Sequence, residues 1–199
     1  MKPWTSRNFA RGPLRNWLQA SGSLSARLAA TGSVFSVQVL RQGREALTPD
    51  EAQALGVARG CAGYAREVLL RVDDHARVFA RSVTTHADSL GAWRSVRGLG
   101  TRPLADVLFK RSGISRGPLS YTQLAPTTVL RRRVSQHLHV SLNPTPQAHD
   151  NLTRSLSARR SAFERRGRPL LVMEVFIAPS SVWCAPSRVH SHAQERFKP

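Results

Sequence analysis

Two pairs of alternating apolar runs, each joined by a short polar turn, constrain this chain more than any other feature. In GYAREVLLRVDDHARVFARSVTT, residues 63–85, the two runs flank Asp73–His75. In SARRSAFERRGRPLLVMEVFIAP, residues 157–179, the segment ERRGRP separates the runs. Side chains alternate between the two faces of a strand, and two such runs around a short turn are typical of a hairpin. The sequence therefore predicts an antiparallel β-sheet.

Helical and strand patterns alternate along the rest of the chain. Residues 15–32 predict two short helices with a Ser/Gly break between them, and residues 34–43 predict a strand that Gly43 ends. Thr48 has the position of an N-cap residue, because a proline and two acids follow it in the first turn of a helix.

The segment between the hairpins predicts further elements. Residues 89–111 predict two helices split by the loop RGLGTRP, and residues 116–124 predict a strand. The order helix, strand, helix, hairpin, helices, hairpin favours a single α+β domain with an antiparallel sheet.

The composition fits one domain with basic ends. The chain has 199 residues, of which 41% are hydrophobic, so it can build a core. We expect a basic lead at residues 1–13, the domain itself at 14–179, a partly ordered insertion at 125–153 and a loose tail at 180–199. These boundaries follow shifts in composition and periodicity.

Cysteine content and hydropathy suggest where the protein works. Cys61 and Cys184 are too few for a disulfide framework and lack metal-site spacing, so we interpret them as incidental thiols of a reducing compartment. No apolar run approaches the roughly 20 residues of a membrane span, and the N-terminus lacks a signal-peptide hydrophobic region. We therefore expect a cytoplasmic protein.

The net charge of +18 first suggests an anionic partner, of which nucleic acid is the commonest. However, the basic clusters Arg131–Arg133, Arg159–Arg160 and Arg165–Arg168 fall in segments that we interpret as loops or turns. They lack the interleaved aromatic residues of a stacking platform, and we find no nucleic-acid-binding motif. We interpret the charge as solvated and attractive to anionic metabolites, and we expect no nucleic-acid partner.

Two H-x-H pairs are the only metal-like patterns. His137 with His139, and His190 with His192, have no acid or cysteine within reach in the sequence, so we interpret them as surface histidines. No glycine-rich phosphate loop and no nucleophile motif is present. The residues therefore predict neither a metal nor a nucleotide cofactor.

Arg66 and Glu174 are charges in otherwise apolar strand patterns. Between Pro169 and Pro179, Glu174 is the only charged residue. Burying an unpaired charge is costly, so one interpretation is an ion pair that joins two strands. The other is a pocket in which Arg66 binds a carboxylate and Glu174 faces the other end of the ligand. The residues alone leave both alternatives open.

Five motifs follow one another in order between Trp17 and Pro179. They are WLQASGSLSARL, LRQG, AREVLLRVDDHARVFARSV, LGTRPLADVLF and SARRSAFERRGRPLLVMEVFIAP. With these motifs the chain resembles the chorismate pyruvate-lyase family over most of its length. The resemblance implies a monomeric α+β domain whose antiparallel sheet has about six strands, with helices and helical flaps over an enclosed ligand pocket.

The resemblance also implies a function and a site. The expected enzyme is a lyase that converts chorismate to 4-hydroxybenzoate and pyruvate, the first committed step towards ubiquinone. Arg66 matches the arginine that holds the ring carboxylate, and Leu24 and Leu104 match positions whose backbone amides line the same anion site. Glu174 matches the glutamate that faces the ring hydroxyl, so we expect its partner to be a ligand hydroxyl and not chiefly another side chain.

Three departures from the family pattern concern details of the site. Leu24 replaces the usual methionine, Asp73–His75 replaces a DG turn, and Ser157 stands near the place of a usual tryptophan. The last departure affects the pocket wall beside Arg159 and Arg160.

The chemistry of the expected reaction is consistent with the absence of cofactor motifs. Loss of pyruvate makes the ring aromatic, so the reaction is downhill and requires orientation, charge stabilisation and a proton path. Arg81 is an additional candidate, for the enolpyruvyl carboxylate or the access route. The alternative function is a non-catalytic module of the same fold that binds an aromatic acid.

Overall fold

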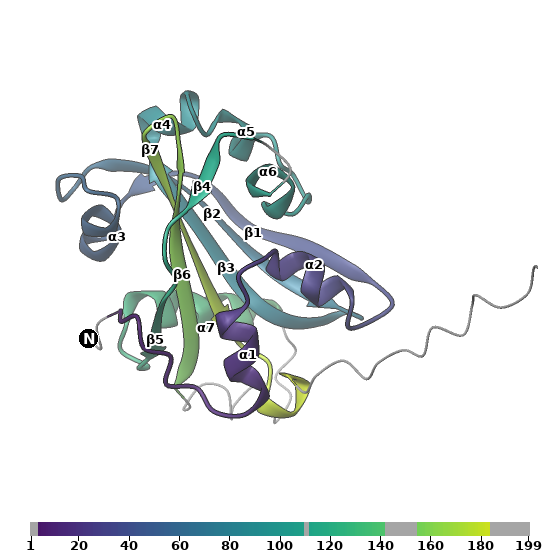
Figure 1. Ribbon diagram of the computed structural model, residues 1–199. Coiled ribbons are helices and arrows are strands. Elements are labelled where there is room, and N and C mark those ends of the chain that lie inside the picture. Colours follow the sequence, from purple (N-terminus) through teal and green to yellow (C-terminus); the bar gives the residue numbers. More distant parts are fainter. Residues whose placement is uncertain (1–3, 110–111, 142–154, 184–199) are drawn as a thin grey trace, which may run out of the picture.

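One antiparallel sheet forms the framework of the protein (Figure 1). The structure is a computed structural model that describes residues 4–109, 112–141 and 155–183. Within these residues the sheet has seven strands: β1 Phe35–Ala46, β2 Ala62–Val72, β3 His75–Thr85, β4 Ile114–Arg116, β5 Ser120–Leu124, β6 Leu156–Arg165 and β7 Arg168–Phe176. They lie in the order β1-β2-β3-β7-β6-β4. Both β4 and β5 pair with the outer edge of β6, β4 with residues 163–165 and β5 with residues 156–160. The short β4 adds to the strands that the sequence predicted.

Both predicted hairpins are confirmed, and each turns through two residues. Asp73 and Asp74 have φ of 48° and 60°, and Arg166 and Gly167 have φ of 52° and 69°. Positive φ at both central residues is the geometry of a type I′ turn, whose twist matches that of the flanking strands. The turns therefore set the initial register of the β2–β3 and β6–β7 pairs.

Short helices fill the connections between strands. They are α1 Pro13–Gln19, α2 Leu24–Ala29, α3 Pro49–Ala54, α4 His86–Leu90, α5 Arg94–Arg97, α6 Ala105–Leu108, α7 Val129–Ser141 and the 3₁₀ helix η1 Ser180–Trp183. The predicted cap of α3 is confirmed, because Thr48 and Glu51 form a reciprocal capping box. Up to residue 109, where the description of this segment stops, the predicted loop RGLGTRP does separate two helices, α5 and α6, but the helix predicted before the loop is broken into α4 and α5. Glycines at 91 and 98 divide this region and the residues before it into the short α4, α5 and α6.

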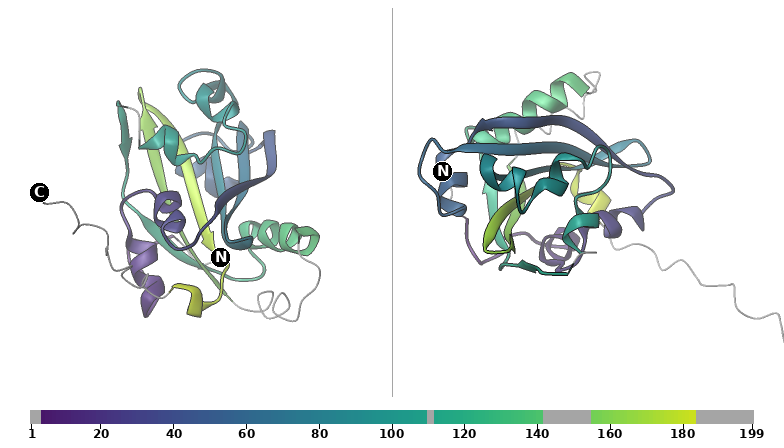
Figure 2. Two further views of the ribbon diagram at one scale, coloured as in Figure 1. Left: turned by 90° about the vertical axis from the view of Figure 1, so that its right-hand side faces the viewer. Right: turned by 90° about the horizontal axis from the view of Figure 1, so that it is seen from above.

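The helices cover both faces of the sheet (Figure 2). On one face, α1, α2 and η1 pack over Val68, Leu70 and Phe176, and α5 and α6 pack over Val172. On the other face, α3 packs over Met173, and α7 packs over other strand residues, among them Leu69, Phe79 and Val175. The alternation of the strands therefore serves two cores, one on each face.

The first strand corrects the prediction that Gly43 ends it. β1 continues to Ala46, and Gly43 pairs with Ala65 of β2. The register shifts between Val39 and Arg41, so that one extra residue is inserted into β1. A neighbouring strand that offers hydrogen bonds up to Ala62 outweighs the weak strand preference of glycine.

The predicted lead and tail contribute to the folded core where the structure describes them. In the lead, the backbone of Thr5 pairs with that of Tyr121 in both directions, at N···O distances of 3.0 and 2.7 Å. In the tail, the Trp183 side chain is 1% exposed and packs edge-on against the rings of Trp17 and Phe176. Residues 184–199 lie outside the described residues.

The first part of the predicted insertion is the helix α7. Its Val134 and Leu138 are buried against the sheet, so this part of 125–153 belongs to the core. Residues 142–154 lie outside the described residues. Among the helices that are described, none is both long and apolar enough to cross a membrane.

Candidate active site

A cavity lies between the sheet and the helices α2 and α6. Its apolar wall is built by strand residues such as Val68, Leu70 and Val172 together with Leu108 and Phe163. The space that no atom fills, mouth included, is about 620 Å³. The charged residues that line it are Arg66, Arg81, Arg116, Arg159 and Glu174.

Arg66 enters the cavity from β2. It is 2% exposed, and its Nη2 donates to the carbonyls of Gly100 at 2.9 Å and Arg102 at 3.2 Å. Its Nε is buried and has no hydrogen-bond partner among the described residues. Burial lowers the pKa of Arg66, partly offset by Tyr64, but an arginine stays protonated at any physiological pH. The guanidinium therefore holds the loop before α6 and keeps donor capacity for an anion.

Glu174 has a protein partner that the sequence analysis did not identify. Arg159 of β6 lies directly opposite Glu174 of β7, and its Nε donates to Glu174 Oε2 at 2.5 Å. Nη1 of Arg159 also donates to the carbonyls of Trp17, Leu18 and Ala20, at 3.0, 3.2 and 2.8 Å. These carbonyls belong to the end of α1, so Arg159 fixes the carboxylate and the helix together.

Arg66 and Glu174 do not pair with each other. Arg66 is opposite Ser82 on β3, Ser82 is opposite Val172 on β7, and Glu174 lies two residues further along β7. With strands about 4.8 Å apart and a rise of about 3.3 Å per residue, their Cα atoms are separated by roughly 10 Å across the sheet and 7 Å along it. These two residues therefore form no ion pair with each other, but Glu174 does form an ion pair that joins two strands, with Arg159 as its partner. The separation of Arg66 and Glu174 leaves space for a small ligand between them.

Arg116 approaches the cavity from β4. Its Nε donates to the Ser161 hydroxyl at 2.9 Å, its Nη1 donates to the carbonyl of Ser21, and its guanidinium lies 5.3 Å from the centre of the Phe163 ring. Burial and the charge of Arg159 lower the pKa of Arg116, and Glu174 partly offsets this. Apart from Arg81, whose guanidinium lies on the other face of the sheet, the lining contains the guanidiniums of Arg66, Arg116 and Arg159 and the carboxylate of Glu174. These four groups have a net charge of +2.

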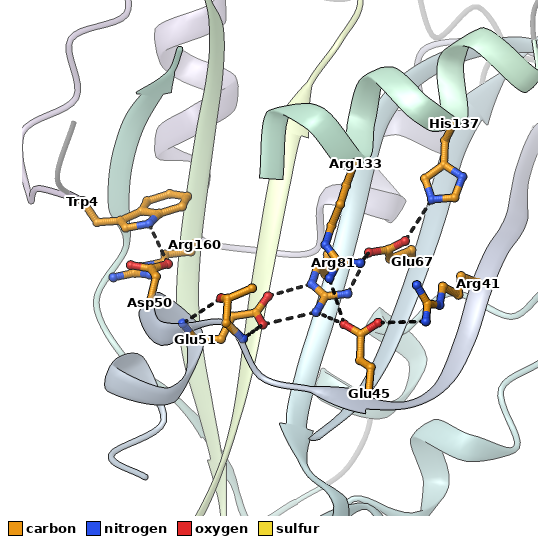
Figure 3. A network of polar contacts seen from close by, with 11 residues as sticks. Trp4, Arg41, Glu45, Asp50, Glu51, Glu67, Arg81, Arg133, His137 and Arg160 are labelled. Atoms are coloured by element: carbon orange, nitrogen blue, oxygen red, sulfur yellow. Dashed lines mark hydrogen bonds and ion pairs between the residues drawn. The ribbon is translucent and has the colours of Figure 1, made fainter. Parts of the chain in front are cut away.

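Arg81 borders the cavity with its strand, but its guanidinium lies on the opposite face of the sheet (Figure 3). There it is 0% exposed and contacts Glu51 at 2.7 Å, Glu67 at 2.7 Å and Glu45. Burial alone would lower the pKa of Arg81, but Glu51 and Glu45 raise it above its ordinary value. The structure separates the guanidinium of Arg81 from those of the other candidate residues, and three carboxylates already occupy it.

The network around Arg81 also changes the interpretation of other basic residues. Arg133 of α7 contacts Glu67 at 3.1 Å and Glu45 at 3.4 Å, and His137 contacts Glu67 at 2.9 Å (Figure 3). The expectation that His137 has no acidic neighbour is therefore wrong. The side chain of His139, and residues His190 and His192, lie outside what the structure describes.

Two of the three basic clusters are not in loops as predicted, whereas the third, Arg165–Arg168, does span the turn between β6 and β7. Arg131–Arg133 lie on α7, and Arg159 and Arg160 lie on β6. The Arg131 and Arg159 side chains are each 1% exposed, so solvated charge is the wrong interpretation for them. Carboxylates and carbonyls brought by distant segments compensate for the burial of Arg159, and sequence composition does not show those partners.

Leu24 and Leu104 line the same cavity as Arg66. Leu24 begins α2, which Ser23 caps by accepting a hydrogen bond from the Ala26 amide at 3.1 Å. Leu104 precedes α6, directly after the loop that Arg66 holds. Both short helices therefore lie over the cavity as covering elements.

A sequence profile described as "Chorismate lyase" matches residues 6–187. The chain belongs to the chorismate lyase family. It is 58% identical over 183 residues to a "Probable chorismate pyruvate-lyase" of Albidiferax ferrireducens, covering 92% of this chain and 90% of that protein. A protein of the same name from Aromatoleum aromaticum is 44% identical over 164 residues, covering 82% and 84%.

Solved structures share the fold at low sequence identity. The PhnF C-terminal domain aligns with a TM-score of 0.53 and 16% identity, over 80% of this chain and 92% of that one. The C-terminal domain of the histidine utilization repressor from Pseudomonas syringae aligns with a TM-score of 0.50 and 11% identity, over 83% of this chain and 100% of that one. These likenesses show the fold of the chorismate lyase chain.

The sequence contained a signal for Arg159 that our prediction did not use. The two-residue turn at Arg166 and Gly167 fixes the hairpin register, and Arg159 and Glu174 lie equally far from it on the two strands. Arg116 had no comparable signal, because β4 is three residues long and its pairing with β6 is not local.

Proposed function

We propose that this protein is a chorismate pyruvate-lyase that converts chorismate to 4-hydroxybenzoate and pyruvate. The observation that carries the proposal is a largely apolar cavity lined by one glutamate and, with Arg81 directed to the other face of the sheet, by the guanidiniums of Arg66, Arg116 and Arg159. Chorismate is a dicarboxylate with an apolar ring, so its charge complements the net +2 of this cavity. Membership in the chorismate lyase family supports the same substrate.

In this proposal Arg66 binds the ring carboxylate. Its buried Nε has no partner among the described residues, and a ligand oxygen there would remove the cost of an unpaired donor. Leu24 and Leu104 line the same cavity, and in this proposal their backbone amides complete the anion site.

Glu174 orients the hydroxyl-bearing end of the substrate. The Nε of Arg159 fixes Oε2 in place, so the carboxylate reaches the cavity in one orientation. A ring carboxylate at Arg66 then directs the opposite hydroxyl towards Glu174, across the β3–β7 part of the sheet. This preorganisation reduces the entropy that is lost when the substrate reaches its reactive orientation.

The reaction needs no external oxidant or reductant. The ether bond to the enolpyruvyl group breaks, the hydroxyl-bearing carbon loses its proton, and the new double bond makes the ring aromatic. The leaving group gains a proton at its methylene carbon and becomes pyruvate, so the atoms of chorismate equal those of the two products. We assign the reaction to a monomeric, cofactor-independent enzyme of the cytoplasm whose 4-hydroxybenzoate supplies ubiquinone synthesis.

The direct test is purified protein with chorismate. The 4-hydroxybenzoate is followed by its ultraviolet absorbance, and pyruvate by lactate dehydrogenase and NADH, with equal amounts of both products expected. The variant Arg66→Ala loses charge-assisted hydrogen bonds worth roughly 1.5–3 kcal/mol each, so kcat/KM should fall by about 100-fold or more. Glu174→Ala should lower kcat by on the order of 100-fold, because the substrate is no longer oriented.

Arg97→Ala is the matched control. Arg97 contacts the Ser89 hydroxyl at 3.0 Å and the Tyr64 ring, but it does not line the cavity. It should keep activity close to that of the unmodified protein. Unchanged rates in both the Arg66 and Glu174 variants would show that the site assignment is wrong.

The second candidate is a non-catalytic module that binds an aromatic acid. The fold shared with the C-terminal domains of PhnF and the histidine utilization repressor favours it. Calorimetry with 4-hydroxybenzoate distinguishes the two functions: binding by a folded sample that releases no pyruvate from chorismate would support the module and exclude the lyase.

A further inference from the structure

The cavity wall formed by β4 and β6 carries two guanidiniums for which the proposed function gives no ligand. We propose that Arg116, held in place beside Arg159, binds the enolpyruvyl carboxylate of chorismate and stabilises the oxygen that the ether leaves behind. This inference rests on the proposed function, because it divides one dicarboxylate between two parts of the same cavity.

The sheet order separates the two anion sites. Arg66 is on β2, and Arg159 is on β6, with β3 and β7 between them. Three strand spacings of about 4.8 Å place their backbones roughly 14 Å apart across the sheet. The side chains are also held at different elements, Arg66 by the carbonyls of Gly100 and Arg102 and Arg159 by carbonyls at the end of α1. The second cluster is therefore placed to serve a different group of the ligand.

The contacts of the two arginines give them different roles. Arg159 is held through Nε and Nη1 by Glu174 and three carbonyls of the α1 end. Arg116 is also held through Nε and Nη1, but by the Ser161 hydroxyl and the Ser21 carbonyl, which are neutral groups. The charge of Arg159 is thus paired with Glu174, whereas in the described part of the chain the charge of Arg116 has no carboxylate in direct contact. We therefore assign the contact with the ligand carboxylate to Arg116 and a positioning role to Arg159.

Electrostatics favours an anion at this wall. Arg116 and Arg159 bring two positive charges, and Glu174 neutralises one of them. The remaining charge is partly buried beside the Phe163 ring, where it attracts an anion more strongly than it would in water. A ligand carboxylate at this position removes the repulsion between the two guanidiniums.

The chemistry needs a cation at the same place. When the carbon–oxygen bond breaks, its electron pair stays on the ether oxygen, which becomes an enolate next to the enolpyruvyl carboxylate. A fixed guanidinium that already binds this carboxylate lies beside the oxygen where the charge forms. Removing one donor of this type in other enzymes lowers kcat by roughly 100- to 1,000-fold.

The first experiment changes the ligand and leaves the protein intact. Binding of 3-(1-carboxyvinyloxy)benzoate is compared by calorimetry with binding of its ester at the enolpyruvyl carboxylate. The unmodified protein should bind the diacid about 10- to 100-fold more tightly, as expected for a charge-assisted hydrogen bond. Equal affinity for the two compounds would overturn the inference, even if the protein is an active lyase.

The second experiment changes the protein. Arg116→Gln should lower kcat with chorismate by about 100-fold and abolish the preference for the diacid, yet keep the affinity for 4-hydroxybenzoate within a few-fold. Arg97→Gln is the control, since Arg97 also contacts a serine hydroxyl and an aromatic ring but lies outside the cavity. Loss of 4-hydroxybenzoate binding in the folded Arg116 variant, or an unchanged kcat, would refute the assignment.

Discussion

Arg81 provides a test of how much of the fold depends on one buried charge. Its guanidinium is fully buried between β1, β2 and α3, and it contacts the carboxylates of Glu45, Glu51 and Glu67 (Figure 3). The substitution Arg81→Met keeps a long apolar stem but removes the cation that the three carboxylates share. Arg133 still contacts Glu45 and Glu67, whereas Glu51 loses its partner in the network.

The expected cost follows from this loss of compensation. Removing one partner of a buried ion pair costs about 3–5 kcal/mol, because the remaining charge stays buried without compensation. Total stability of a domain is about 5–15 kcal/mol, so Arg81→Met should be close to the limit of folding. Arg81→Lys keeps a positive charge and should therefore lose less stability. Its unfolding can be measured even if Arg81→Met does not fold.

The destabilisation should depend on pH. Burial alone would raise the pKa of Glu51, but Arg81 and Thr48 lower it below the ordinary value of 4.5. In the unmodified protein this stabilisation is full above about pH 4.5 and is lost as the pH falls through the lower folded pKa. Without Arg81 burial should dominate and raise the pKa of Glu51, so the variant should gain stability as the pH falls from 8 to 5.

Urea unfolding followed by tryptophan fluorescence measures both effects, since Trp17, Trp93 and Trp183 are buried. The control is Arg41→Met, which removes an exposed contact of 3.5 Å to Glu45 and should cost less than about 1 kcal/mol. A decrease in the free energy of unfolding that is no larger for Arg81→Met than for Arg41→Met would refute this reasoning. So would a stability deficit of Arg81→Met, relative to the unmodified protein, that grows as the pH falls.

Two further predictions concern segments that the sequence left open. Trp183→Ala should cost about 3–5 kcal/mol in urea unfolding, because the ring is buried against Trp17 and Phe176; a loss below about 1 kcal/mol would show that this segment does not belong to the core. Asp74→Gly should raise the melting temperature, because it relieves φ of 60° at a cost of about 1 kcal/mol in a non-glycine residue. Asp73→Gly should lower it instead, since Asp73 Oδ1 accepts from the amides of Ser33 and Val34 at 2.9 Å; the same sign for both variants would contradict the turn geometry.

Local patterns in the sequence were enough to predict the hairpins. Alternation along β7 places Val172, Glu174 and Phe176 on one face, and these residues line the cavity or its adjoining core. The cap of α3 was also predictable, since Thr48 and Glu51 act within one helical turn. Both features depend on residues close in the chain, whose geometry is fixed by backbone sterics and local hydrogen bonds.

The partners of the charged residues depend on register, which the local pattern does not determine. An extra residue in β3, at the shift between Leu70 and Arg71 of β2, places Arg81 opposite Glu67. Continued from the turn without this shift, the register would place Arg81 opposite Arg66. A slip of one residue moves a side chain to the other face of a sheet. The shift therefore explains why the guanidinium of Arg81 lies on the face opposite the cavity.

The sequence by itself determined the antiparallel hairpins, the cap of α3 and, through five ordered motifs, the family. Apart from Arg159 and Glu174, whose pairing follows from the turn between β6 and β7, only the tertiary structure decided which charges meet. The shift in β1 brings Glu45 to the face that holds Arg81, and the pairing of β4 with β6 brings Arg116 to the cavity with Arg159 and Glu174. These neighbours come from strands far apart in the chain. Their contacts are fixed by bulges and packing that no local period records.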